Sequence, residues 1–199
     1  MDITVILLIL AAYFAGGIPS GYLSARAFKK IDIRKHGSGN PGAVNVYRVA
    51  GPAAGVITLI FDISKGFVPV FAAQRLFPEQ ETVFLLVGAA AIAGHLWMVF
   101  LRFDGGKGVA TTAGVFLALL PKPMVPTLAV CAAGVVFSGH FSIGSIAGAA
   151  AFPFLALAFG AAPGRAGLAF LSCSLILFKH IPNLKRILRG QPVGAKPGS

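Results

Sequence analysis

Seven apolar runs, separated by charged or turn-forming residues, constrain the fold of this 199-residue chain more than any other feature. A helix needs about 20 apolar residues to cross the hydrocarbon of a bilayer. Charged residues make up only 12% of the chain, against about 25% in an average soluble domain. The sequence therefore predicts an all-α integral membrane protein with seven transmembrane helices in a single domain, residues 1–199. The expected spans cover residues 3–25, 50–77, 83–101, 108–120, 124–138, 141–160 and 166–179.

Three further predictions concern the spans themselves. The run from Ile3 to Leu23 is too long for the apolar core of a cleavable signal and follows Asp2 instead of basic residues, so we expect a retained helix. Asp62 and Lys65 lie three residues apart, and their pairing would lower the cost of burying both charges. Glycines within the spans predict close helix packing. They are Gly16, Gly17, Gly21, Gly144 and Gly148.

Positive charge is distributed unevenly around the spans. Thirteen of the 17 Lys and Arg residues fall on one side, three fall on the other, and Lys65 lies within a span. Because cytoplasmic loops are enriched in Lys and Arg, the N-terminus is expected outside and the C-terminus in the cytoplasm. The net charge of +11 then indicates a cytoplasmic face near anionic lipid, and not a nucleic-acid surface. The thirteen residues are Arg26, Lys29, Lys30, Arg34, Lys35, Arg48, Arg102, Lys107, Lys179, Lys185, Arg186, Arg189 and Lys196.

Three polar segments fall on this same side and are expected to meet there. The first, residues 37–48, reads GSGNPGAVNVYR. Its glycines allow sharp turns and exposed N–H groups, while Ser38, Asn40 and Asn45 add hydroxyl and amide donors and Arg48 adds a cation. A plain turn between spans needs only one or two such residues. The surplus favours a site for an anion such as phosphate.

The second segment, residues 102–112, reads RFDGGKGVATT and leads into the fourth span. Free N–H groups, the positive end of a helix dipole and the charge of Lys107 together form a typical anion site. The spacing of a nucleotide-binding P-loop is absent, which excludes nucleotide hydrolysis. The third segment, residues 179–186, reads KHIPNLKR. His180 and Asn183 would share a helix face if the helix continued, although Pro182 favours a break there.

The remaining polar residues give no separate site. His95, and His140 with Ser142 and Ser145, are expected to pack between helices. The four scattered histidines do not predict a metal site, and neither a catalytic triad nor a cofactor is expected. Cys131 and Cys173 are expected to be packing thiols.

The strings GSGNPGAVNVYR, GGKGVAT and KHIPNLKRILRG, with DISKG and GHLWMVFL between them, resemble the bacterial acylphosphate-dependent glycerol-3-phosphate acyltransferases of the PlsY type. The resemblance covers essentially the whole chain. It implies a seven-helix enzyme of the bacterial inner membrane with its active site facing the cytoplasm. Such an enzyme transfers an acyl group from acyl phosphate to position 1 of sn-glycerol 3-phosphate and releases lysophosphatidic acid and phosphate, an early step of phospholipid synthesis. Its partners are these substrates and membrane lipids, and a monomer is expected.

The resemblance also implies roles for residues of the three segments. Lys107 and Arg48 would bind the phosphates. Ser38, Gly39 and Asn40 would contact the acyl phosphate and the developing oxyanion, with Asn45 as a further substrate-binding residue. His180, oriented by Asn183, would place or deprotonate the attacking hydroxyl, or a substrate phosphate would take the proton instead. Close backbone approach by glycerol phosphate would fall to Gly105, Gly106 and Gly108.

Two positions depart from the family pattern. Asp104 stands where a basic residue is usual, and Gly190-Gln191-Pro192 stands where a glutamate is frequent.

Two other classes of function compete with an acyltransferase. A small transporter or channel for an organic anion is disfavoured because the polar segments lie on one side and no inverted repeat is evident. A purely structural lipid-binding protein would not explain three separate anion-type loops.

Overall fold

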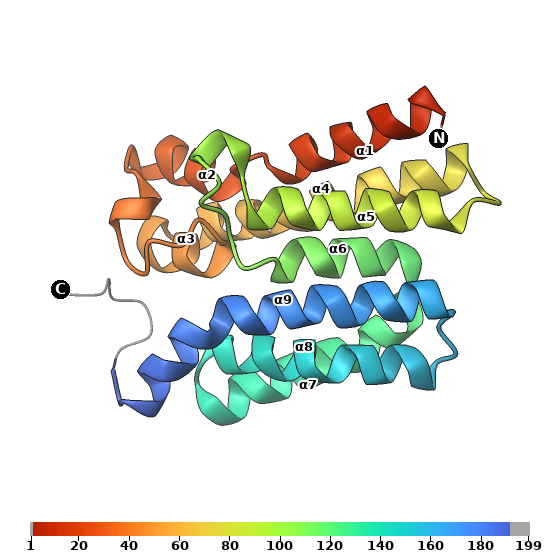
Figure 1. Ribbon diagram of the computed structural model, residues 1–199. Helices are drawn as coiled ribbons and strands as arrows, with labels where there is room; N and C mark the ends of the chain where they lie inside the picture. Colours follow the sequence, from red (N-terminus) through yellow and green to blue (C-terminus); the bar gives the residue numbers. More distant parts are fainter. Residues whose placement is uncertain (1, 192–199) are drawn as a thin grey trace.

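The computed structural model, which describes residues 2–191, is a bundle of helices whose long axes run roughly alongside one another (Figure 1). The helices follow each other with short connections. The helices are α1 (Ile3–Gly16), α2 (Ser20–Lys29), η1 (Ile33–Lys35), α3 (Ala43–Ala50), α4 (Pro52–Leu76), α5 (Glu81–Leu96), η2 (Val99–Leu101), α6 (Val109–Leu119), α7 (Pro121–Ser138), α8 (Phe141–Ala158) and α9 (Pro163–Leu188). The shorter elements α2, η1, α3 and η2 gather at one end (Figure 1).

Six helical segments of the described residues are long and apolar enough to cross a bilayer, and α6 is a shorter apolar helix. Its 11 residues rise about 16 Å at 1.5 Å per residue, against a hydrocarbon thickness of about 30 Å. The loop before α6 packs inside the protein, where Gly105, Gly106 and Gly108 are buried. Of the seven expected spans, six are long enough to cross, and the fourth, which was expected to be short, corresponds to the short helix α6.

Two expected helix boundaries are wrong for identifiable reasons. The first span is broken, because α1 ends at Gly16 and α2 begins at Ser20, after Pro19. Pro19 lacks the N–H needed to continue a helix. The last helix was expected to end near residue 179, but α9 runs through Pro182 to Leu188. Consequently His180 and Asn183 lie on one continuous helix.

Glycines bring the helices together as expected. A methyl group on Gly16 would collide with the carbonyl oxygen of Ala91 in α5, and one on Gly148 would collide with Sγ of Cys131 in α7. A methyl group on Gly21 would collide with the carbonyl oxygen of Pro41. Close packing at these glycines is confirmed. The predicted pair is also present, with Lys65 Nζ 2.7 Å from a carboxylate oxygen of Asp62.

The three polar segments lie toward the same end of the bundle. Figure 1 shows α2, α3, the loop before α6 and the last turns of α9 gathered at the end opposite the N-terminus. At the other end, Arg165 of α9 pairs with Glu81 of α5 at 2.7 Å and donates to the carbonyl of Leu119 in α6. Two residues of the earlier charge and motif comparisons, Pro192 and Lys196, lie outside the described residues.

Candidate active site

The first polar segment folds around the side chain of Asn45, which is only 6% exposed. Its amide nitrogen donates to the carbonyls of His36 at 3.1 Å and Asn40 at 3.0 Å. Its amide oxygen accepts from the N–H of Ser38 at 3.0 Å. Three hydrogen bonds from one side chain thus fix a turn in which Gly37 and Gly39 have positive φ, a backbone region that favours glycine.

This arrangement corrects two expectations about the segment. Both amide hydrogens of Asn45 are used inside the loop, so Asn45 shapes the loop and has no donor left for a ligand. The N–H groups of Gly39 and Gly42 are also used internally, by the His36 carbonyl and the Asn40 side chain. The donors that remain in this loop include the hydroxyl of half-buried Ser38 and the amide nitrogen of Asn40, whose amide oxygen accepts from Gly42.

The second segment combines a helix start with a cation. Gly108 precedes α6 with φ of 86°, and no side chain caps this helix among the described residues. The first N–H groups of an α-helix lack intrahelical partners, and they carry the positive end of the helix dipole. Lys107 stands directly before this helix start. The arrangement suits a phosphate or another anion.

Lys107 lies in a cationic environment. Burial, followed by the charges of Arg186 and Arg48, lowers the pKa of Lys107 from 10.5 to about 8. Both named side chains are cations, so one residue from each polar segment contributes to a single positive site. Bringing three like charges together is unfavourable, and a bound polyanion would relieve this repulsion.

The third segment places His180 and Asn183 on α9 but gives each a different partner. The Nδ1 of His180 lies 2.8 Å from the carbonyl oxygen of Ile176. A carbonyl only accepts, so Nδ1 carries the hydrogen and Nε2 keeps its lone pair. Asn183 donates to the hydroxyl of Ser142 in α8 at 2.6 Å. The expectation that Asn183 orients His180 is therefore wrong, since the Ile176 carbonyl does so.

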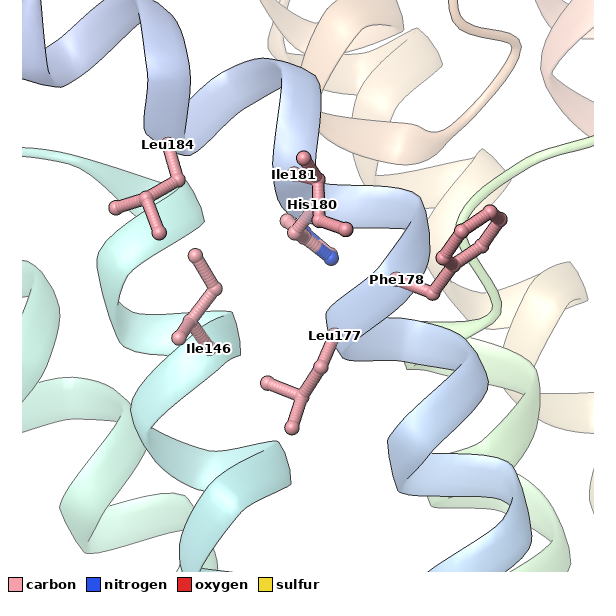
Figure 2. Close-up of a pocket in the computed structure, with 6 residues that line it drawn as sticks. All are labelled: Ile146, Leu177, Phe178, His180, Ile181 and Leu184. Carbon is pink, nitrogen blue, oxygen red and sulfur yellow. The ribbon is translucent and has the colours of Figure 1, made fainter.

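His180 also borders an apolar groove of about 400 Å³ between α8 and α9. Figure 2 shows Ile146 on α8 facing Leu177 and Leu184 on α9 across this groove, with the His180 ring between them. The histidine thus connects an apolar groove with the cationic site, because the charge of Lys107 acts on it. The lining residues are Ile146, Leu177, Phe178, His180, Ile181 and Leu184.

Two site residues were missed from the sequence. Arg186 was placed in the third polar segment but given no role of its own, and Ser142 was expected only to pack between helices. The positions 180, 183 and 186 are spaced three apart, which places them along one side of a helix. This signal was overlooked because Pro182 favoured a helix break. Ser142 had no such signal, because its contact with Asn183 joins residues 41 positions apart.

Comparisons with known proteins agree with this architecture. A family model described as glycerol-3-phosphate acyltransferase matches residues 6–190. A glycerol-3-phosphate acyltransferase from Endomicrobium trichonymphae is 44% identical over 183 residues, covering 92% of each chain. One from Geobacter sulfurreducens is 42% identical over 185 residues, covering 93% of this chain and 94% of the relative.

Solved structures agree as well. The crystal structure of PlsY, an integral membrane glycerol 3-phosphate acyltransferase, in its glycerol 3-phosphate form matches with a TM-score of 0.90 at 32% identity and covers 94% of both chains. The lysophosphatidic acid form matches with a TM-score of 0.87 at 30% identity, covering 94% of this chain and 93% of that one. The chain therefore belongs to the glycerol-3-phosphate acyltransferase family, as an integral membrane acyltransferase.

Proposed function

We propose that this enzyme transfers an acyl group from acyl phosphate directly to the sn-1 hydroxyl of glycerol 3-phosphate, without an acyl-enzyme intermediate. The products are lysophosphatidic acid and inorganic phosphate. The observation that carries this proposal is Lys107, which directly precedes the uncapped start of α6 and is acted on by the charges of Arg48 and Arg186, together with a histidine that borders an apolar groove. Two phosphate-bearing substrates and one acyl chain need these three environments together.

The chemistry requires binding and orientation more than a protein nucleophile. Acyl phosphate is a mixed anhydride, so phosphate is already a good leaving group. The hydroxyl oxygen of glycerol 3-phosphate attacks the acyl carbon, and the bond from that carbon to the phosphate oxygen breaks with its electron pair leaving on phosphate. Lys107 and Arg48 bind the phosphate charges, while the Ser38 hydroxyl donates to the acyl phosphate and its developing oxyanion. Orientation of the two substrates supplies the rest of the rate enhancement.

His180 is the proposed acceptor of the hydroxyl proton. Its Nδ1–H is held by the Ile176 carbonyl, so the lone pair of Nε2 is available to the attacking hydroxyl. Asn183 and Ser142, bonded to each other at 2.6 Å, complete this wall of the site between α8 and α9. A leaving-phosphate oxygen is the competing acceptor, and variants of His180 separate the two.

The membrane arrangement is part of the proposal. We place the site at the cytoplasmic face of the bacterial inner membrane, with the N-terminus outside, because Lys and Arg are concentrated at this end. The start of α1 and the end of α9 lie at opposite ends of the bundle (Figure 1), which supports an odd number of crossings with α6 as the short seventh. The acyl chain would then lie in the groove between α8 and α9, entering from the bilayer.

An activity assay tests the function. The purified protein in lipid is given acyl phosphate, glycerol 3-phosphate or both, and phosphate release is measured. Release that depends on both substrates is expected. Uptake of glycerol 3-phosphate into sealed vesicles without phosphate release would contradict the proposal and favour a transporter.

At alkaline pH, the activity should depend on the protonation of Lys107. Its pKa of about 8 lies below the ordinary 10.5, so in the free enzyme the ammonium is present below pH 8 and is lost as the pH rises through that value. We expect kcat/KM for glycerol 3-phosphate to fall over this range. Lys107→Arg keeps its charge at every accessible pH, so its profile should lack this fall. An unchanged alkaline fall in Lys107→Arg would assign it to another group.

The preference for acyl-chain length tests whether the acyl chain binds in the groove between α8 and α9. Ile146→Trp adds bulk within the approximately 400 Å³ groove, so kcat/KM for long-chain acyl phosphates should fall about tenfold or more while short chains are spared. Leu157→Trp is the matched control, because Leu157 is on the same helix but 50% exposed and outside the groove. Equal losses for long and short chains in Ile146→Trp would place the acyl chain elsewhere.

A further inference from the structure

A buried polar cluster lies behind the glycine loop that carries Lys107. Asp62 of α4 accepts a hydrogen bond from the hydroxyl of Ser20 at 2.5 Å and lies 2.7 Å from Lys65 Nζ. Lys65 also donates to the carbonyl of Ile18, at 3.0 Å, in the break between α1 and α2. Ser20, Asp62 and Lys65 are all less than 9% exposed. The cluster therefore fastens α4 to the start of α2 well inside the bundle.

His95, in the last turn of α5, lies between this cluster and the glycine loop. Its Nδ1 is 3.6 Å from Asp62 Oδ1, beyond hydrogen-bond distance, and has no hydrogen-bond partner among the described residues. On the other side, the His95 carbonyl accepts the N–H of Gly106 at 3.0 Å. A methyl group on Gly106 would collide with Nε2 of the His95 ring, and one on Gly105 would collide with the carbonyls of His95 and Leu96.

These contacts explain, without reference to the substrate, why residues 105 and 106 are glycines. Both glycines rest on the end of α5, so a side chain at either position would push the loop away from the helix. Lys107 follows directly, and the charges of Arg48 and Arg186 act on it. Because like charges repel, the loop needs a rigid support if Lys107 is to stay among them.

We propose that His95 is a positioning residue of the acyl-transfer site: its ring and carbonyl form the platform that holds Gly105 and Gly106, and hence Lys107, in place. Asp62 lies behind this platform, 3.6 Å from Nδ1 of His95, and its cluster joins α4 to the start of α2. The proposal rests on the function proposed above. It replaces the expectation that His95 only packs between helices, and it assigns to His95 no contact with substrate.

A double-mutant cycle tests the platform. Gly106→Ala alone should lower kcat/KM about 100-fold, because its methyl group displaces the loop from the His95 ring. His95→Ala alone should raise KM for glycerol 3-phosphate, because the loop loses its support. The double variant should be about tenfold or more better than the product of the two single effects, because the missing ring makes room for the methyl group. Effects that simply multiply would overturn the proposal.

A matched control uses another glycine that packs against the same helix, α5. A methyl group on Gly16 would collide with Ala91 of α5, and not with His95. His95→Ala should therefore give no rescue of Gly16→Ala, and the effects of these two changes should multiply. Rescue of Gly16→Ala as well would show general loosening of α5 and would count against a specific platform. His95→Gln should raise KM for glycerol 3-phosphate less than His95→Ala does. Equal KM values in wild type and His95→Ala would count against a platform made by the ring.

A second measurement is independent of catalysis. The rate at which an amine-reactive acylating reagent labels Lys107 in folded protein, read by peptide mass spectrometry, reports the position of the loop. Labelling should be faster in Gly106→Ala than in wild type and should return toward the wild-type rate in the double variant. The same rate in all four proteins would overturn the platform. If the labelling rates differ among the variants as expected but the wild-type protein releases no phosphate, the proposed function fails while the platform stands.

Discussion

Lys107→Ala is expected to lower kcat/KM about 100- to 1,000-fold, a loss on the order of 3 to 4 kcal/mol of transition-state stabilisation. Lys107 precedes an uncapped helix start and is acted on by Arg186 and Arg48. Its removal takes away a point charge where phosphate charge must be balanced during the transfer, in a partly buried site that water screens weakly. Arg48→Ala should reduce kcat/KM in the same direction.

The measurement is steady-state kinetics with a short-chain acyl phosphate, which limits effects of acyl-chain binding. Lys122→Ala is the matched control, because Lys122 is exposed at the start of α7, at the opposite end of the bundle. It should behave like wild type. Near-normal activity of both Lys107→Ala and Arg48→Ala would remove the assignment of phosphate binding to these two residues.

His180→Ala is expected to lower kcat about 100- to 10,000-fold, the range typical of general acid–base catalysis. kcat should change more than KM, because a base acts mainly in the transition state. His180→Gln retains a polar side chain but no basic nitrogen, so it should be nearly as impaired. Asn183→Ala should be milder, because Asn183 bonds to Ser142 and not to the histidine.

The pH dependence of the residual activity separates two routes for the proton. If His180→Ala keeps measurable turnover with the wild-type pH profile, the histidine is not the base and a substrate phosphate takes the proton. If His180→Gln is nearly as active as wild type, the ring contributes only binding. Either result would contradict the role proposed for Nε2.

The bilayer explains why so much of the fold could be predicted. Apolar length and the distribution of Lys and Arg limit the possible arrangements of a helical membrane protein, and the close packing at Gly16 and Gly148 and the pair of Asp62 with Lys65 are confirmed. The expectations of an unbroken helix at Pro19 and of a helix break at Pro182 were wrong, because the same residue type interrupts one helix and is accommodated in another. Tertiary packing decides between these outcomes.

Within the site, the residue types could be predicted from the sequence, but the hydrogen-bond partners could not. Residue types indicated an anion site, because glycines, hydroxyls and cations in three segments have few other uses in such a chain. The hydrogen bonds of Asn45 within its own loop could not be predicted, because the sequence does not show whether an asparagine side chain is already hydrogen-bonded. Likewise, the contacts of His95 with Gly106 and of Asn183 with Ser142 join distant positions. Only the folded arrangement reveals them.

Direct transfer between two bound substrates is the central claim, and a rapid-quench experiment tests it most directly. Enzyme is mixed with acyl phosphate alone, or together with glycerol 3-phosphate, and phosphate, lysophosphatidic acid and acylated protein are measured in the same samples. The account predicts no phosphate burst with acyl phosphate alone, and equal amounts of phosphate and lysophosphatidic acid with both substrates. A burst of phosphate equal to the enzyme concentration, accompanied by acylated protein, would contradict it.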